Sequence, residues 1–584
     1  MAELSQISTY ELYTDPDGAP ESPRHGPDLG VDLSSSASQL ELPRVLGAVF
    51  PIETLDVSGD IVVLFTMELI SEKAQYFNRT LLLSVVVIAV STFNYGFDNQ
   101  AFATTQSMEA FTRHFGEYYE STDTYELNSQ WLSLFNSLNY IGFAAGVLIG
   151  SFISARLGRR WCMFIMSVYA LVSATITVTS NSNDQIMTGR ILNYVYVGME
   201  LAVVPVFQSE IVPAPVRAFV VGSYQLSLTL GGVVINATCY GTSHISDNRS
   251  WRIPLGLFYI VPSIIAVSIF FLPESPRWLL QQNRVEEAKQ SLREFRAGAF
   301  AEEQINNEFK ELEFALENEV EQGNFIELFQ GTNLKRTLIV VLVNFFQQAT
   351  GQAFTSQYGG VYVRSLKIFN PQLFTLMSSC ISAAVQIVIL FMADKTGRRT
   401  LLMLSAVIMM GGLMAMGGLG VDEPVTIPRM KGVISLMVVF GVGFASGWGP
   451  LTYVLTTEIT SLRLRDHTSR LGFAVNVCFN FAVNFSVPYL VFENEVGLGS
   501  KVGFIFGSVA FLALVFTYFC VPECKGKTLE QVDWLFNNGV RLRDFGKTDA
   551  SGMLDGGVVG VKDSDIEAAP SKTRSKTHSH VVEG

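Results

Sequence analysis

One acidic residue stands inside a long apolar segment of this chain. Asp98 lies in the stretch FNYGFDNQAF, at the end of an otherwise uncharged run from residue 81 to 98. An ionisable group inside a membrane-spanning segment costs roughly 2.5 to 3.5 kcal/mol, so it is by default a candidate for function. A carboxyl group at this place can take up and release a proton.

A second group of polar residues has mostly amide side chains. Gln347, Gln348, Gln352, Gln357 and Tyr358 lie within another apolar segment, 337–362. A neutral, hydroxyl-rich ligand needs paired donors and acceptors, which amides and phenols supply. Lipid cannot satisfy so many amides, so we expect them to face a wet cavity. The alternative is that they only join neighbouring helices.

The elements that must position these residues are membrane helices. The chain has 584 residues, 49% hydrophobic and 16% charged, whereas a soluble domain has roughly 25% charged residues. A window of about 20 apolar residues spans a bilayer as a helix. About twelve such windows predict an all-α membrane protein: 81–98, 130–154, 161–180, 186–207, 219–241, 253–272, 337–362, 372–393, 401–420, 432–457, 470–490 and 502–521.

Three short polar motifs occur twice, in the same order. Gly-Arg-Arg follows the second and eighth windows, a Glu and an Arg seven positions apart follow the fourth and tenth, and Pro-Glu follows the sixth and twelfth. The chain is therefore expected to consist of two homologous halves of six helices each. Parallel repeats of this kind place a substrate site near the membrane midplane, between the halves.

Most loop arginines and lysines fall on one side of the predicted bundle, which the positive-inside rule makes the cytosol. We expect five parts, with both tails cytosolic: an acidic, mostly disordered tail over 1–78, a first half over 79–272, an intracellular helical linker over 273–336, a second half over 337–521 and a C-terminal tail over 522–584.

Over residues 81 to 540 the chain resembles the sugar porter branch of the major facilitator superfamily. The resemblance rests on the two Gly-Arg-Arg turns, on Gly189-Arg190 and on longer strings: PVFQSEIVPAPVRA, LPESPRWLL, QQATGQ, GWGP, TEITSLRLR and VPECKGKTLEQVD. The family's fold, twelve helices in two halves with an intracellular helical domain, agrees with the predicted helices. Fungal sugar transporters are the most similar in pattern.

The resemblance implies roles for individual residues. In proton-coupled members of the family, an acidic residue at the position of Asp98 pairs with an arginine at the position of Arg190. The resemblance therefore implies symport. The alternative is a permanent ion pair that never exchanges a proton. The substrate-binding positions implied, together with those that the residues themselves suggest, are Gln225, Gln347, Gln348, Gln352, Tyr358, Trp448, Tyr453, Asn476 and Asn480. Two positions depart from the family: Ala353 replaces an asparagine and Tyr453 a tryptophan, so we expect a selectivity other than an ordinary glucose one.

Charged residues at the cytosolic helix ends form the predicted gate. We expect ion pairs between the two halves to hold the inner side shut, each worth on the order of 0.2 to 1 kcal/mol; the alternative is that these charges only set topology. The predicted gate residues are Arg159, Arg160, Glu210, Arg217, Glu274, Arg277, Asp394, Arg398, Arg399, Glu458, Arg465 and Glu523. Ala155 stands where the family has an aspartate.

The most favoured function is a membrane transporter of a monosaccharide, hexose or pentose, coupled to protons. Alternatives are a facilitative carrier, a disaccharide, polyol or quinate-like substrate, or a non-transporting nutrient sensor. We expect no metal, cofactor, nucleic acid or obligate protein partner, and no enzymatic activity, because no metal-ligand cluster or phosphate-binding string is found. The resemblance implies the plasma membrane.

Overall fold

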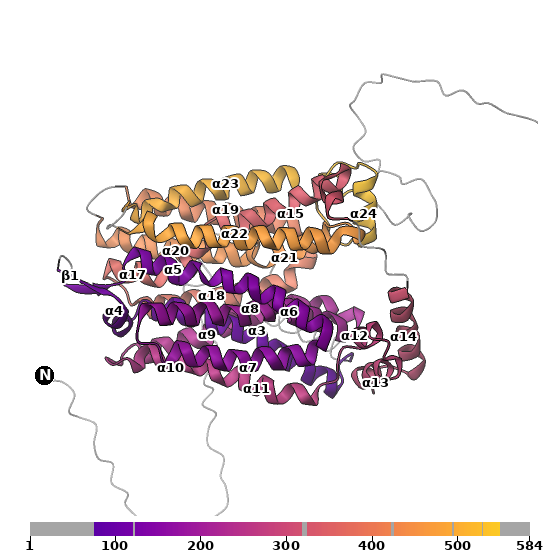
Figure 1. The fold of residues 1–584 in the computed structure, drawn as a ribbon. Coiled ribbons are helices and arrows are strands. Elements are labelled where there is room, and N and C mark those ends of the chain that lie inside the picture. The colour runs from indigo at the N-terminus through magenta and orange to yellow at the C-terminus, as the bar shows by residue number, and fades with distance from the viewer. Residues whose placement is uncertain are drawn as a thin grey trace, which may run out of the picture. The chain divides into compact units, whose positions relative to one another are not determined.

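The computed structural model describes residues 75–120, 123–317, 324–421, 425–492, 496–527 and 529–548. Most of the predicted N-terminal tail, 1–74, and the end of the C-terminal tail, 549–584, lie outside this part. Ten of the described helical segments are long and apolar enough to cross a membrane. The chain is thus a multi-pass helical membrane protein (Figure 1).

The first half contains the following elements: α3 (Arg79–Thr105), α4 (Glu109–Phe115), β1 (Glu117–Tyr119), β2 (Thr124–Glu126), α5 (Ser129–Ser137), α6 (Asn139–Leu157), α7 (Arg159–Val178), α8 (Asn183–Ile211), α9 (Ala214–Thr242), α10 (Arg249–Gly256), η1 (Leu257–Tyr259), α11 (Ile260–Ser268) and η2 (Ile269–Phe271). Strands β1 and β2 pair antiparallel, with Tyr118 opposite Tyr125.

The linker contains α12 (Pro276–Gln281), α13 (Val285–Arg296), α14 (Glu302–Glu317) and η3 (Phe325–Phe329). The second half contains α15 (Gly331–Ala349), α16 (Gln352–Ser356), α17 (Gly359–Leu366), α18 (Pro371–Thr396), α19 (Arg398–Leu419), α20 (Ile427–Ser446), α21 (Trp448–Glu458), η4 (Leu462–Leu464), α22 (Arg465–Val491), η5 (Gly499–Lys501) and α23 (Val502–Cys520), and is followed by α24 (Leu529–Asn537).

All twelve apolar windows are at least partly helical, although ten segments meet the criteria of length and hydropathy. The two others are 219–241, on α9, and 337–362, which is divided among α15, α16 and α17. The second is interrupted at Gly351, which adopts a left-handed conformation with φ of 90°. A Cβ at Gly351 would lie 2.5 Å from the ring of Phe506, so both backbone and packing require glycine there.

Each half buries its own hydrophobic core. One cluster of buried side chains runs from Leu81 to Leu272 and adds Phe295 of the linker. The other runs from Ile339 to Phe545 and adds only Leu132 from the first half. Two separate cores are what two homologous six-helix halves require, because each bundle must bury its own apolar faces.

Glycines bring α6 and α8 into close contact. A Cβ at Gly142, Gly146 or Gly198 would lie 2.0 to 2.1 Å from a backbone oxygen of the opposite helix. Lipid provides no hydrophobic drive for helix association, so close backbone packing between small residues stabilises such pairs. The contact holds α8, which carries Arg190, at a fixed place in the first half.

The two halves are hydrogen-bonded at one end of the bundle and at its middle. We call the end with Arg159, Arg160, Arg398 and Arg399 the arginine end, and the end with β1, β2 and α4 the far end (Figure 1). The bonds near the far end include Ser133 Oγ to Phe485 O (2.5 Å), Gln357 Nε2 to Asn99 Oδ1 (3.0 Å) and Gln372 Nε2 to Ser107 Oγ (3.1 Å). Near the middle, Thr229 Oγ1 donates to Gln386 Oε1 at 2.7 Å.

The linker helices lie at the arginine end and have a small core of their own, around Trp278, Leu292 and Phe309. Arg296 on α13 is buried and binds both carboxylate oxygens of Glu308 on α14 at 2.8 and 2.9 Å. It also donates to Ile211 O at the end of α8, at 2.8 Å. The linker is therefore attached to the first half by a buried charged contact.

Candidate functional site

Asp98 and Arg190 meet in the interior of the first half. Arg190 Nη1 on α8 lies 3.1 Å from Asp98 Oδ2 on α3, and both side chains are almost fully buried. The guanidinium also lies 4.2 Å from the ring centroid of Phe102 and 4.8 Å from that of Tyr194. The pair predicted by family resemblance is thus formed, and its opposite charges compensate each other in a dry environment.

A chain of hydrogen bonds leads from this region to the second half. Tyr194 OH donates to Asn99 Oδ1 at 2.9 Å, and Gln357 Nε2 donates to the same oxygen at 3.0 Å. Asn99 follows Asp98 directly on α3, and Gln357 lies between α16 and α17. Movement of the second half relative to the first would therefore change the contacts of the residue next to Asp98.

Four amides form one cluster in the second half. Asn476 Nδ2 on α22 donates to Gln347 Oε1 at 2.6 Å, and Gln348 Nε2 donates to Asn476 Oδ1 at 3.1 Å. Gln347 Nε2 donates in turn to the carbonyl oxygen of Gly449, beyond the break between α20 and α21, at 3.0 Å. The fourth amide, Asn344, receives a longer contact of 3.4 Å from Asn476 Nδ2. Three of the predicted substrate residues are therefore in mutual contact.

The other predicted binding residues are placed as follows. Trp448 and Tyr358 are fully buried, and Tyr358 OH donates to Asn484 O at 2.6 Å. Asn480 accepts from Asn484 Nδ2 at 2.5 Å, whereas Tyr453 is 37% exposed. Gln225 and Gln352 are half-buried, on α9 and α16. Of these six, Trp448 meets the amide cluster through its backbone, because Gln347 Nε2 donates to Trp448 O at 3.3 Å.

Asn344 is a residue of the amide cluster that sequence analysis did not predict. It is fully buried on α15 and donates to Thr456 Oγ1 on α21 at 2.8 Å. Its position three residues before Gln347 places it on the same face of a helix, which was the available signal. Asn344 ties the cluster to α21 and thereby orients Gln347 and Asn476.

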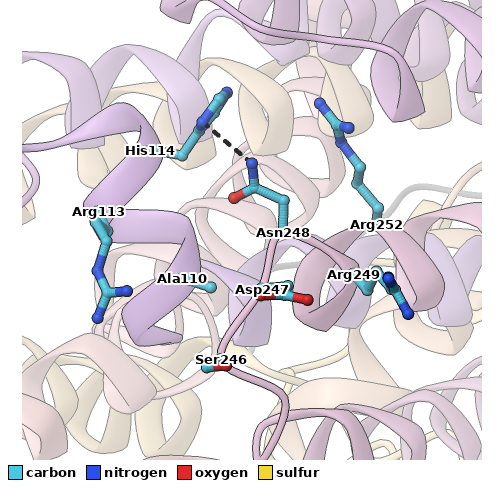
Figure 2. Close-up of a pocket in the computed structure, with 8 residues that line it drawn as sticks. All are labelled: Ala110, Arg113, His114, Ser246, Asp247, Asn248, Arg249 and Arg252. Carbon is cyan, nitrogen blue, oxygen red and sulfur yellow. Dashed lines mark hydrogen bonds between the residues drawn. The ribbon is translucent and has the colours of Figure 1, made fainter.

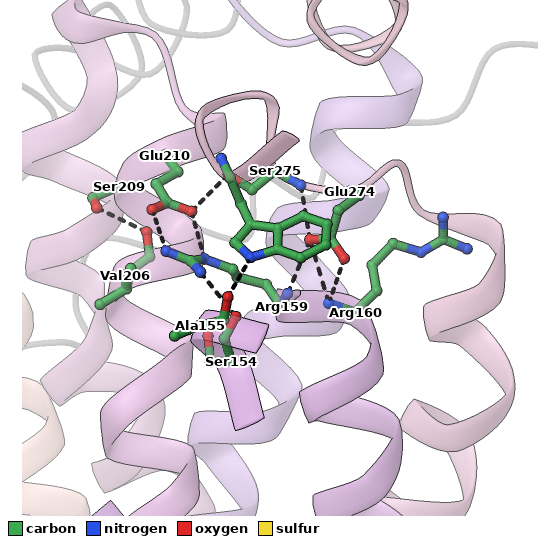
Figure 3. A network of polar contacts seen from close by, with 10 residues as sticks. Ser154, Ala155, Arg159, Arg160, Val206, Ser209, Glu210, Glu274 and Ser275 are labelled. Carbon is green, nitrogen blue, oxygen red and sulfur yellow. Dashed lines mark hydrogen bonds and ion pairs between the residues drawn. The ribbon is translucent and has the colours of Figure 1, made fainter. Parts of the chain in front are cut away.

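At the arginine end of the first half, a charged network surrounds the start of α7 (Figure 3). Arg159 binds Glu210 with two hydrogen bonds, Nη2 to Oε1 at 2.7 Å and Nε to Oε2 at 2.9 Å. Glu274 accepts from the backbone N–H groups of Arg159 (3.0 Å) and Arg160 (3.1 Å). A carboxylate at this place is stabilised by the unpaired N–H groups and the dipole of the helix N-terminus.

The second half repeats this arrangement at the start of α19. Glu523 accepts from the backbone N–H groups of Arg398 (3.0 Å) and Arg399 (3.1 Å), and Arg398 Nη2 lies 3.2 Å from Glu458 Oε1. Gly158 and Gly397 precede the two helices with φ of 94° and 92°. A Cβ at either position would lie 2.5 to 2.6 Å from the capping carboxylate, which explains why glycine precedes both arginine pairs.

In this structure Arg159 binds Glu210 and Arg398 binds Glu458, each within its own half, and the pairing of gate residues across the halves stays a prediction. The physical reason is that each glutamate ends a helix that lies beside its arginine in the same bundle. Arg277 is exposed on α12 and Arg465 begins α22. The side chains of Arg217 and Asp394 lie outside the described part.

Burial raises the pKa of Glu274 above the 4.5 of an ordinary glutamate, although the backbone N–H groups of Ser275, Arg160 and Arg159 oppose the shift. The folded state then binds more proton than the unfolded state, so this contribution to stability is complete below about pH 4.5 and is lost as the pH rises through the folded-state pKa.

We expect the melting temperature in detergent to fall with rising pH, and to fall less steeply in Glu274→Gln. Glu294→Gln, on the exposed face of α13, is the control; an equal slope in Glu274→Gln would contradict the prediction.

A hollow of about 490 Å³ lies at the far end, beside α4 and the start of α10 (Figure 2). Arg113, His114, Arg249 and Arg252 line it, and Asn248 Nδ2 lies 3.4 Å from His114 Nδ1. Burial and the charge of Arg252 lower the pKa of His114, so its ring is neutral at neutral pH. None of the predicted substrate residues lines this hollow.

Comparisons with known proteins agree with this arrangement. A family model described as "Sugar (and other) transporter" matches residues 84–536. The high glucose sensor RGT2 of Saccharomyces cerevisiae is 29% identical over 474 residues, which cover 78% of this chain and 61% of the sensor. Hexose transporter HXT13 of the same yeast is 27% identical over 467 residues, which cover 78% of this chain and 82% of that protein. A structure of the xylose transporter XylE from E. coli, in a partially occluded inward open conformation, superimposes with a TM-score of 0.64 at 21% identity, covering 77% of this chain and all of that one.

Proposed function

The chain belongs to the sugar (and other) transporter family, whose model spans residues 84–536, and from this we propose that it carries a monosaccharide, hexose or pentose, across the membrane by proton-coupled symport. As a member of a transporter family it is not an enzyme. The observation that carries the proton coupling is the buried pair of Asp98 and Arg190. An arginine stays charged, so the group that exchanges a proton is the carboxyl of Asp98.

The amide cluster supports a sugar as the substrate. Trp448 Nε1 is a buried donor and Gln348 Oε1 a buried acceptor, and neither has a hydrogen-bond partner among the described residues. Leaving such groups unpaired is costly, and sugar hydroxyls can satisfy both, because a hydroxyl donates and accepts. Tyr453, 37% exposed, offers an aromatic face to the C–H side of a sugar ring.

The proposed orientation places the arginine end and both termini in the cytosol, and the protein in the plasma membrane. Under this assignment the far end is external, and the hydrogen bonds near that end, such as Ser133 to Phe485, close the external side. The intra-half networks of Arg159 and Arg398 would then act as rigid ends of each half rather than as the inner lock. Alternating access follows from rocking of the two halves around the midplane cluster.

The proposed function is tested by uptake of labelled D-glucose, D-xylose, maltose, glycerol and quinate in a yeast strain without its own hexose carriers, at acidic external pH. We expect saturable uptake of a monosaccharide that a protonophore abolishes. Uptake that is indifferent to the protonophore would make the protein a facilitative carrier, and uptake of one of the other compounds alone would make the substrate wrong.

A sensor is the second candidate, because the high glucose sensor RGT2 is among the relatives. The same experiment separates the two functions. A protein that reaches the cell surface and transports none of the five compounds would favour the sensor. In that case, expression of a sugar-responsive reporter gene in the same cells is the measurement that tests it.

Removal of Gln347 should weaken substrate binding strongly. Its amide bonds Asn476 and the carbonyl of Gly449 at the same time, so Gln347→Ala leaves both without their partner. The loss of about 1 to 3 kcal/mol that this implies corresponds to a KM for uptake raised roughly 5- to 150-fold. Gln304→Ala, which alters a glutamine of the linker helix α14, is the matched control and should leave KM as it is. A KM for Gln347→Ala within twofold of the native value would contradict this role.

A further inference from the structure

A second carboxyl group lies inside the first half and has no role in the mechanism described so far. Glu200 is on α8, ten residues beyond Arg190 toward the arginine end, and its side chain is fully buried. Its Oε2 accepts from Tyr224 OH on α9 at 3.2 Å. Its Oε1 is buried and has no hydrogen-bond partner among the described residues, and the same holds for Thr92 Oγ1 on α3.

No cation compensates a charge on Glu200 within the described part of the chain. The titratable groups that face it are tyrosines: Tyr95 on α3, Tyr196 on α8 and Tyr224 on α9. The nearest arginine along α8, Arg190, is about 15 Å away at 1.5 Å per residue and is already paired with Asp98. A buried carboxylate without a positive partner is strongly disfavoured, whereas the neutral acid carries its own hydrogen-bond donor.

The neutral form of Glu200 can satisfy the two unpaired atoms without a buried charge. A protonated carboxyl group accepts from Tyr224 through one oxygen and can donate through the other, and the Thr92 hydroxyl faces it from α3. An ionised carboxylate has no hydrogen to donate. It could accept from the Thr92 hydroxyl, but its negative charge would stay buried without a positive partner, which is costly.

The site is also connected to the predicted substrate region. Tyr224 is half-buried, and its side chain interacts electrostatically with that of Tyr453. Tyr453 belongs to α21 of the second half and is 37% exposed. Glu200 is therefore hydrogen-bonded to a tyrosine that lies close to the second half. A rearrangement of α9 against α21 would expose its carboxyl group to water.

We propose that Glu200 is a second protonation site of the transport cycle, which holds a proton in the conformation shown and releases it to water when the halves rearrange. The step breaks the carboxyl O–H bond and transfers the proton to a water molecule, which leaves a carboxylate with Tyr224 as donor. This inference rests on the proposed function, with Asp98 as the first site.

The protonation state is measured by infrared difference spectroscopy on the purified full-length protein at neutral pH. We expect the carbonyl-stretch band of a protonated carboxylic acid in the native protein, absent in Glu200→Gln and still present in Asp98→Asn. Glu200→Gln keeps the size of the side chain and an acceptor for Tyr224, so it is expected to fold. Native and Glu200→Gln spectra with the same acid band would show that Glu200 is ionised and would overturn the proposal.

The role in the cycle is measured by D-glucose counterflow in proteoliposomes from about pH 5 to about pH 9, a range that covers perturbed carboxyl groups. Asp98→Asn should still lose exchange at alkaline pH, at least tenfold, and the double variant Asp98→Asn/Glu200→Gln should not. Identical profiles of the two variants would place Glu200 outside the cycle and refute the proposal. Should native protein give counterflow of neither D-glucose nor D-xylose, the proposed substrate fails, while the infrared result still decides the protonation of Glu200.

Discussion

Asp98→Asn should abolish proton-driven accumulation of the substrate. A membrane potential of about 100 mV supplies about 2.3 kcal/mol per proton, which supports a gradient of roughly 50-fold at one proton per sugar. Without an ionisable group at position 98 no proton is bound beside Arg190, so the internal and external concentrations should become equal. The measurement is the steady-state ratio of labelled substrate across the membrane of energised cells.

Two measurements distinguish a loss of proton coupling from a folding defect of the variant. The asparagine leaves Arg190 buried without its carboxylate, so the variant must be shown at the cell surface and must still exchange substrate in counterflow. The matched control is Asp184→Asn, an exposed aspartate in the first turn of the same helix, α8. If Asp98→Asn cells accumulate substrate to the native level, and a protonophore dissipates it, then Asp98 is structural.

Arg159→Ala should give the largest loss of stability. The side chains of Arg159 and Glu210 are only 10% and 7% exposed, and two hydrogen bonds of 2.7 and 2.9 Å join them. Removal of one partner from a buried ion pair leaves the other charge uncompensated, which costs about 3 to 5 kcal/mol. The expected result is a clearly lower melting temperature of the purified protein in detergent, with loss of surface expression.

Arg160→Ala is the matched control for this prediction. The Arg160 side chain donates to Phe270 O at 3.0 Å on the exposed side of the network, so its loss should cost about 1 kcal/mol or less. The backbone N–H of residue 160 remains bound to Glu274 in the variant. Equal melting temperatures of the two variants would mean that the ion pair with Glu210 contributes nothing beyond a surface contact.

Arg159 and Arg398 illustrate what the repeated motifs could predict and what they could not. The repeated Gly-Arg-Arg turns predicted two homologous halves, and the described part of the chain contains two separate hydrophobic cores. The partners that the two arginines have in this structure were not predicted, because a motif reports that charges lie at a helix end but not which neighbouring helix ends beside them. In the structure that neighbour belongs to the same half.

The sequence by itself determined the class of the protein and the approximate positions of its helices. Apolar windows of about 20 residues decide this, because lipid forces each such segment to satisfy its own backbone as a helix. Only the tertiary structure decided which other polar groups meet: Asn344 with Thr456, and Glu200 with a tyrosine instead of a cation. Those contacts join helices that are distant along the chain, and packing of the helices, not local sequence, sets their distances.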